Sequence, residues 1–272
     1  MNIKTNTLRG FSTLLVLAWL ACTLPLQAQT VLFSEDFEST TTTGDLNGKS
    51  TSDGNATYSV TKTNSVFQSR AASEDKITAG LGSYIGQIYG NATNQPTWIT
   101  MSPNLNATAN YTFKIDYLLY AGTGQFGINA RSDTQNANCS FRLTWSGGTA
   151  SFSYVDAQGS ATLLGTVTAT ASEKASSFYL RNIVVTVTGN TQQLSVNGTT
   201  IGGVVATQGT VNDAANDQIR FYGISGSGAV DIRLDNLSAT TVAVPEPSTA
   251  SMLFGATMLI TATALGAMRR HR

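Results

Sequence analysis

The sequence predicts an all-β protein, an antiparallel sandwich or jelly roll. Apolar and polar residues alternate over many short segments, turn residues separate these segments, and no long window shows a helical period. The alternating segments are 111–117, 141–145, 151–155, 183–187, 193–196 and 219–223, and the turns between them include 146–148, 156–159, 188–190 and 197–198. Many strands joined by short turns, without helices, favour two packed antiparallel sheets.

The composition predicts a polar but nearly uncharged surface. Charged residues make up 12% of the 272 residues, against about 25% in an ordinary globular protein. Lys plus Arg and Asp plus Glu both count 16, and no basic run lies outside the extreme C-terminus. Because phosphate neutralisation requires clustered Lys and Arg, nucleic acid is excluded as a partner.

The few cysteines and histidines exclude several kinds of site. Cys22 lies in a segment predicted to be removed, so the mature chain keeps only Cys139 and has no internal disulfide. We interpret Cys139 as a small buried apolar side chain. The one histidine, His271, lies in the terminal basic cluster, which excludes a Ser-His-Asp triad and the usual zinc sites.

Residues 1–28 are predicted to be a secretory signal peptide. Lys4 and Arg9 precede an apolar run at 11–20, and Ala28 is a small residue at the expected cleavage point. The alternative is a transmembrane anchor, but the run is shorter than the roughly 20 residues that a bilayer crossing needs. The chain is therefore expected to be exported.

A membrane-spanning helix is predicted at about 250–268. This stretch is uncharged and mostly apolar, and Arg269, Arg270 and Arg272 follow it. Basic residues directly after a span hold that end on the cytoplasmic side. A buried core helix is the alternative, but such a helix would show a polar face, and this stretch offers only Ser and Thr.

The residues ahead of the span form a motif, Val244, Pro245, Glu246 and Pro247. This motif, the uncharged span and the Arg-rich end together resemble the PEP-CTERM sorting signal of bacterial exported proteins, over residues 244–272. The resemblance implies that an exosortase-type enzyme processes the chain near Pro-Glu-Pro. The precursor would be anchored in the inner membrane by its C-terminal helix, and the product would reach the cell surface or extracellular matrix.

The body, residues 29–243, is predicted to be one β-sandwich domain. Its opening segment 31–38 and closing segment 229–238 resemble the first and last strands of concanavalin-like and carbohydrate-binding jelly rolls. In such folds these strands pair, so Glu35, Asp36 and Asp235 would share a structural Ca²⁺, which prefers clustered oxygen ligands. The alternative is that these carboxylates lie at strand ends and face solvent. No other cofactor is expected.

Two kinds of carbohydrate site are weighed against the sequence, a glycosidase active site and a sugar-binding surface. A glycosidase needs two carboxylates facing each other across a sugar, and nothing in the sequence places such a pair, so no catalytic residue is assigned. A sugar-binding sandwich usually offers an exposed aromatic platform. Trp98 is the candidate ligand-binding residue because it follows a loop, although an aromatic residue in a strand more often belongs to the core.

These observations favour an exported surface or matrix protein that is not an enzyme and has a structural or adhesive role. The alternative is a surface carbohydrate-binding module with a polysaccharide as partner, and a second alternative is a glycan hydrolase. Exposed aromatic residues on one sheet would favour the binding module, whereas paired carboxylates in a groove would favour the hydrolase.

Overall fold

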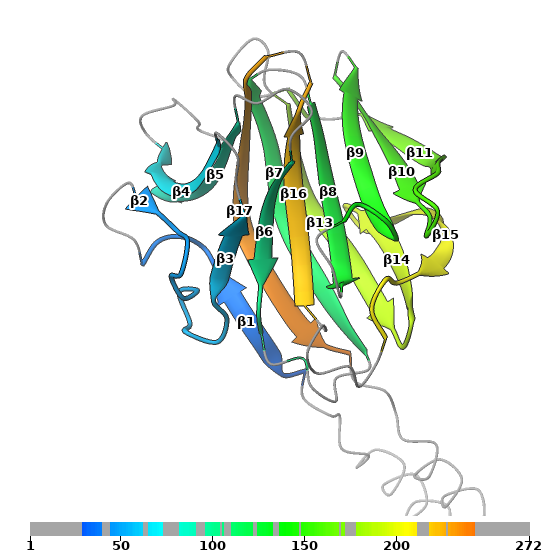
Figure 1. Ribbon diagram of the computed structural model, residues 1–272, viewed down its shortest axis with the longest axis horizontal. Coiled ribbons are helices and arrows are strands. Elements are labelled where there is room, and N and C mark those ends of the chain that lie inside the picture. The colour runs from blue at the N-terminus through cyan, green and yellow to red at the C-terminus, as the bar shows by residue number, and fades with distance from the viewer. Residues whose placement is uncertain are drawn as a thin grey trace, which may run out of the picture. The chain divides into compact units, whose positions relative to one another are not determined.

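Figure 1 shows the computed structural model of the chain. It describes residues 29–39, 44–61, 65–72, 82–90, 96–103, 105, 110–121, 124–132, 136–146, 148–168, 170–171, 178–210, 218–226 and 228–242. Contacts within the chain define a compact unit, Thr30–Val242, to which all of the strands below belong.

The described residues form strands and turns and contain no α-helix, so the all-β prediction is confirmed. In chain order the strands are β1 (Val31–Glu35), β2 (Gly44–Asp45), β3 (Tyr58–Thr61), β4 (Ser65–Ala71), β5 (Tyr84–Gly90), β6 (Pro96–Met101), β7 (Asn110–Ala121), β8 (Gly124–Ser132), β9 (Ser140–Ser146), β10 (Thr149–Val155), β11 (Ala161–Thr168), β12 (Thr170–Ala171), β13 (Phe178–Thr188), β14 (Thr191–Val196), β15 (Thr199–Ala206), β16 (Gln218–Ser225) and β17 (Val230–Thr241).

The strands form two antiparallel sheets that pack face to face (Figure 1). The β17 sheet has ten strands in the order β15-β14-β13-β7-β17-β5-β4-β2, with β1 beside β17 and β12 beside β13. The β16 sheet has seven strands in the order β11-β10-β9-β8-β16-β6-β3. The predicted antiparallel sandwich is therefore confirmed.

Aromatic side chains join the two sheets across the core. Phe67 of β4 meets Phe221 of β16 edge to face, with ring centroids 5.9 Å apart. Tyr117 of β7 packs on Phe126 of β8 at 4.9 Å. Each such pair contributes about 0.5–1.5 kcal/mol beyond the apolar area that it buries. These rings belong to one continuous core made by alternate residues of both sheets.

Two of the predicted turns are tight hairpins. Val196 pairs with Thr199, and between them Asn197 and Gly198 have φ of 50° and 79°. Positive φ at both central residues is typical of a type I′ turn, whose twist matches the right-handed twist of the flanking strands. Asn-Gly adopts this turn at little cost. The β13–β14 turn likewise uses Gly189, with φ of 56°. The turn signals predicted at 188–190 and 197–198 are therefore confirmed.

The first and last strands pair, as predicted. Phe33 of β1 lies opposite Ala239 of β17, and Glu35 lies opposite Leu237. Farther towards its N-terminal end, β17 pairs with β5 on that same side. The final strand thus lies in the interior of its sheet.

Several strands had no predicted counterpart because their burial does not alternate. β8 is buried at seven consecutive positions, so both of its faces are covered. β11 is the opposite case, since no residue of it is fully buried. Period-two patterning appears only where one face is buried and the other is wet, so the sequence does not reveal these strands.

The edge strands β11 and β15 lie side by side and close one side of the sandwich. Each carries a register shift, between β10 and β11 and between β14 and β15. Gly165 of β11 faces Ile201, and Gly202 of β15 faces Leu164. A Cβ on Gly202 would lie 2.9 Å from two Leu164 side-chain carbons, so only glycine allows this approach. We call this contact the β11–β15 seam.

The predicted signal peptide, the motif Val244 to Pro247, the span at 250–268 and the basic residues Arg269, Arg270 and Arg272 lie outside the described residues. Within the described ranges, no helix is long and apolar enough to cross a membrane.

The seam predicts unequal effects of alanine at two neighbouring glycines. Gly202→Ala should lower the free energy of unfolding by roughly 1–3 kcal/mol, because its φ is 71° and its Cβ would strike Leu164. Gly203→Ala is the control, since its Cβ would meet nothing within 4 Å. Thermal and urea unfolding followed by circular dichroism measures both. Equal stability of the two variants would show that the seam tolerates a side chain.

Candidate functional site

The outer face of the β16 sheet is the candidate site, because aromatic, amide, hydroxyl and guanidinium groups gather on it. In its central strands the core residues Ile99, Phe221 and Phe126 alternate with residues that point away from the core. None of the seven strands contains Asp or Glu. Outward residues in directly opposed positions form rows across the sheet.

The first row begins with two stacked aromatic rings. Trp98 of β6 lies opposite Tyr222 of β16, and their ring centroids are 4.5 Å apart. Tyr222 lies opposite Gly127 of β8, where a Cβ would overlap the tyrosine ring. The glycine therefore lets the ring lie across the neighbouring strand. The next residue in the row is Arg142 of β9.

Trp98 does not form the exposed platform on which its prediction as a ligand-binding residue rested. Only 6% of its surface is exposed, and Tyr222 is fully buried. The prediction was wrong on exposure because the position after a loop does not reveal that Tyr222 packs against the indole. Trp98 instead supports Tyr222 from the side, and the accessible part of the row begins at Arg142, which is half-buried.

A polar row runs beside the aromatic one. Arg220 of β16 donates from Nε to Thr100 Oγ1 at 3.2 Å, from Nη1 to Ser132 Oγ at 2.9 Å and from Nη2 to Gln218 Oε1 at 2.6 Å. These bonds fix a buried guanidinium on three strands of the sheet. Arg220 is thereby held as a rigid part of the face.

Asn129 of β8 lies opposite Arg220 and is fully buried. Its Nδ2 donates to the Asn138 carbonyl at 3.2 Å and to Gln208 Oε1 at 2.9 Å. Its Oδ1 is buried and has no hydrogen-bond partner among the described residues. An acceptor left in this state costs about 1–3 kcal/mol.

Half-buried polar side chains surround Arg142 and form what we call the Arg142 patch. Gln125, Arg142, Thr144, Ser151 and Ser153 belong to it. Thr144 lies opposite Gln125 on one side and Ser151 on the other, and Arg142 lies opposite Ser153. The Nε atom of Arg142 is buried and has no hydrogen-bond partner in the described ranges. The patch thus offers hydroxyl, amide and guanidinium groups together.

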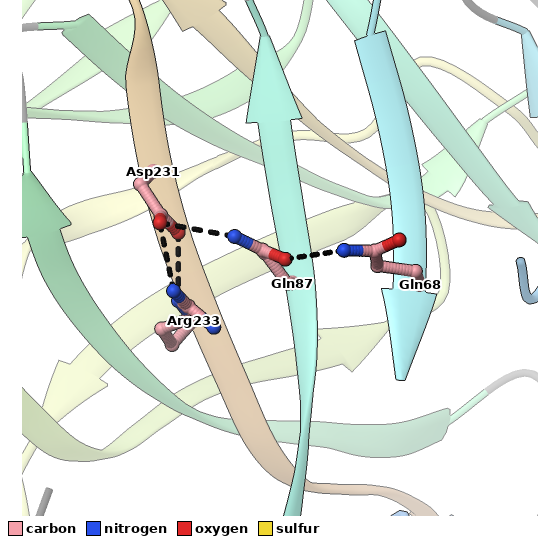
Figure 2. Close-up of polar contacts among 4 residues, drawn as sticks. All are labelled: Gln68, Gln87, Asp231 and Arg233. Atoms are coloured by element: carbon pink, nitrogen blue, oxygen red, sulfur yellow. Dashed lines mark hydrogen bonds and ion pairs between the residues drawn. The ribbon is translucent and has the colours of Figure 1, made fainter. Parts of the chain in front are cut away.

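The outer face of the β17 sheet carries a different network, shown in Figure 2. Arg233 Nε lies 2.7 Å from Asp231 Oδ1, and Arg233 Nη2 donates to Asp231 Oδ2 at 2.7 Å. Gln87 donates to the same Oδ2 at 3.0 Å, and Gln68 donates to Gln87 Oε1 at 2.7 Å. The guanidinium also lies 4.7 Å from the ring centroid of Tyr120. Its charge is neutralised inside the network, which therefore joins β4, β5 and β17 structurally.

The three residues predicted to bind calcium are not gathered into one ligand set. Glu35 accepts hydrogen bonds from the Phe37 N–H at 2.6 Å, from the Ser52 N–H at 3.2 Å and from the Tyr58 hydroxyl at 3.0 Å. Its carboxylate therefore secures the segment after β1. Among the described residues, no group of three or more His, Cys, Asp or Glu side chains could hold a metal ion. The residues present do not fit the predicted site.

Asp235 instead lies opposite Asp116, at the centre of the β17 sheet. Asp116 accepts from the Asn182 N–H at 2.7 Å and from Asn236 Nδ2 at 3.1 Å, and both asparagines have φ of 50° at register shifts. Burial raises the pKa of Asp235 to about 7, and the charges of Asp116, Glu38 and Asp36 act in the same direction. The Asn236 N–H, which donates to Asp235, opposes this shift.

The residues Tyr222, Arg142 and Asn129 were not predicted as site residues. The segments 141–145 and 219–223 were predicted as strands, and alternation puts Arg142 on the face opposite Phe141, and Tyr222 on the face opposite Phe221. The sequence does not reveal the strand register that brings Tyr222, Gly127 and Arg142 into one row.

The fold is similar to those of several solved proteins. A carbohydrate esterase, vb_24B_21 of the Shiga toxin-encoding bacteriophage phi24B, is 13% identical, with 79% of this chain and 100% of that chain covered and a TM-score of 0.49. The cellulose-induced protein Cip1 is 14% identical, with 78% and 98% covered and a TM-score of 0.45. The carbohydrate-binding module CBM66 of Bacillus subtilis is 10% identical, with 57% and 86% covered and a TM-score of 0.36.

These similarities describe chain architecture at low identity and carry no argument about activity. No protein-family model matches the chain, and no curated protein matches it. The class that the structure defines is the antiparallel β-sandwich.

The raised pKa of Asp235 predicts that stability falls as the pH rises from about 4 to about 7. The folded state holds this proton more tightly than the unfolded state, whose carboxyl titrates near 3.8, so folding is favoured below that window and penalised above it. Asp235→Asn should remove the penalty and flatten a slope of at most about 1.4 kcal/mol per pH unit. Urea unfolding at several pH values measures it.

Asp45→Asn provides a matched control, since Asp45 is exposed in β2. This variant should keep the pH slope of the unmodified chain. An unchanged slope in Asp235→Asn would contradict the assignment of the proton to Asp235.

Proposed function

We propose that the chain is an exported cell-surface or extracellular-matrix protein whose sandwich binds polysaccharide, and that it is not an enzyme. The observation that carries the binding proposal is the arrangement on the outer face of the β16 sheet. There the half-buried Arg142 patch adjoins the row that contains Tyr222. Such mixtures suit a sugar, because hydroxyl, amide and guanidinium groups pair with sugar hydroxyls.

The pairing of β1 with β17 supports the jelly-roll, concanavalin-like class that the sequence suggested.

Export and sorting rest on the sequence at the two ends. The predicted signal peptide 1–28, the motif Val244 to Pro247 and the predicted span at 250–268 are the parts of an exosortase substrate in their usual order. An exosortase-type enzyme is the proposed processing partner. The membrane holds the precursor until processing.

A purely structural or adhesive role is the second candidate, and the burial of Trp98 favours it. A glycan hydrolase has less support. Hydrolysis on this face would require a pair of carboxylates, and the strands of the β16 sheet supply none.

Polysaccharide binding at this face predicts that a larger side chain in the Arg142 patch weakens the binding. Thr144→Leu should weaken retention on insoluble polysaccharides by roughly tenfold, because it removes a hydroxyl and fills the surface. Thr186→Leu is the control, since Thr186 is also a half-buried strand threonine but lies in the β17 sheet. A pull-down over a panel of polysaccharides measures both variants. Equal retention of the two would place binding elsewhere.

The sorting proposal predicts a change in the size and location of the chain in the exporting cell. Glu246→Ala should leave an unprocessed chain in the membrane fraction, because the residue between the two prolines is part of the motif that the enzyme recognises. Thr249→Ala, outside the motif, should be processed normally. Cell fractionation with immunoblotting distinguishes them. Normal release of the Glu246→Ala chain would exclude Pro-Glu-Pro processing.

A further inference from the structure

We propose that the polysaccharide bound by the β16 sheet is acidic, and that Arg142 binds its carboxylate groups. This inference rests on the proposed function and specifies its ligand. The confinement of strand carboxylates to the β17 sheet, the lack of a carboxylate partner for Arg142 and the place of Arg142 in the row support it.

The acidic residues of the strands all belong to one sheet. The β17 sheet contains Glu35, Asp45, Asp116, Asp231 and Asp235. The strands of the β16 sheet contain Arg131, Arg142 and Arg220 and no acid. A chain with equal numbers of acidic and basic residues thus keeps one sheet free of strand carboxylates. A face without carboxylates does not repel an anionic polymer.

Arg142 differs from Arg233 of the β17 sheet. Arg233 is buried against Asp231 through two contacts of 2.7 Å, so its charge is compensated within the protein. Arg142 is half-buried, and its Nε is covered without a hydrogen-bond partner in the described part of the chain. A guanidinium offers donors in a planar fork that matches a carboxylate. Asp231 therefore compensates Arg233, whereas no carboxylate in the strands of the β16 sheet compensates Arg142.

The position of Arg142 suits a sugar carboxylate. Tyr222 lies across Gly127, so Arg142 is the first side chain in the row beyond the tyrosine ring. Ser153 lies opposite Arg142 on the other side. A sugar seated here would place its carboxylate on the guanidinium and its hydroxyls on the serine and on the neighbouring Thr144.

The test compares two polymers that differ only in charge. Polygalacturonate and its carboxyl-reduced derivative are titrated into the full-length chain at low salt, with affinity measured by calorimetry. The unmodified chain should bind polygalacturonate roughly tenfold or more tightly than the reduced polymer, because a charge-assisted hydrogen bond is lost with the carboxylate. Added salt should narrow the difference.

Arg142→Gln should lose that preference and bind both polymers equally. Arg181→Gln is the matched control, because Arg181 is a half-buried strand arginine of the β17 sheet whose Nε is also unpartnered, and its guanidinium lies 5.5 Å from the Tyr179 ring centroid. It should bind like the unmodified chain. Arg142→Lys controls for misfolding of Arg142→Gln. It keeps the positive charge but loses the planar fork of donors, so its affinity for polygalacturonate should lie between those of the unmodified chain and Arg142→Gln.

The outcomes separate this inference from the proposed function. Equal binding of both polymers by the unmodified chain would overturn the acidic ligand and leave polysaccharide binding standing. Equal losses in Arg142→Gln and Arg181→Gln would overturn the role of Arg142. Binding of neither polymer, nor of any polysaccharide in the pull-down panel, by a chain shown to be folded would overturn both proposals.

Discussion

The position of the last strand is the constraint on which the rest of the structure depends. β17 is paired along one side by β1 and β5 and along the other by β7. Its side chains are buried on both faces of the sheet from Val230 to Asp235. The β17 sheet is therefore continuous only when the final strand is in place. The register shift that holds Asn236 against Asp116 fixes how β17 and β7 align.

The two outer faces of the sandwich hold their buried guanidinium groups in different ways. On the β17 sheet, the carboxylate of Asp231 compensates the charge of Arg233, and the two glutamines extend the network. On the β16 sheet, neutral side-chain oxygens accept hydrogen bonds from Arg220, and the strands contain no carboxylate. The strands of the two sheets thus differ in the groups that hold their guanidinium side chains.

The fold class and two tight hairpins were predictable, because period-two patterns and turns rich in Gly and Asn are local signals. The pairing of the first and last strands was predicted from the resemblance to jelly rolls. Strands such as β8 and β11 were not, since burial on both faces or neither erases the alternation. The candidate site was least predictable. Trp98 was chosen as an aromatic residue that follows a loop. Its exposure depends on Tyr222, which lies far away in the chain and reaches it only through strand pairing.

The β11–β15 seam bears on how copies of this chain behave before they are folded. Neither edge strand contains a charged residue, and Leu163 and Val204 remain 62% exposed on them. Uncharged edge strands are templates for pairing with another chain. In the folded molecule, the bulges turn these two edges towards each other. Until the β10–β11 and β14–β15 hairpins meet, crowded copies would aggregate through them, so closing this seam protects the chain from aggregation as well as stabilising it.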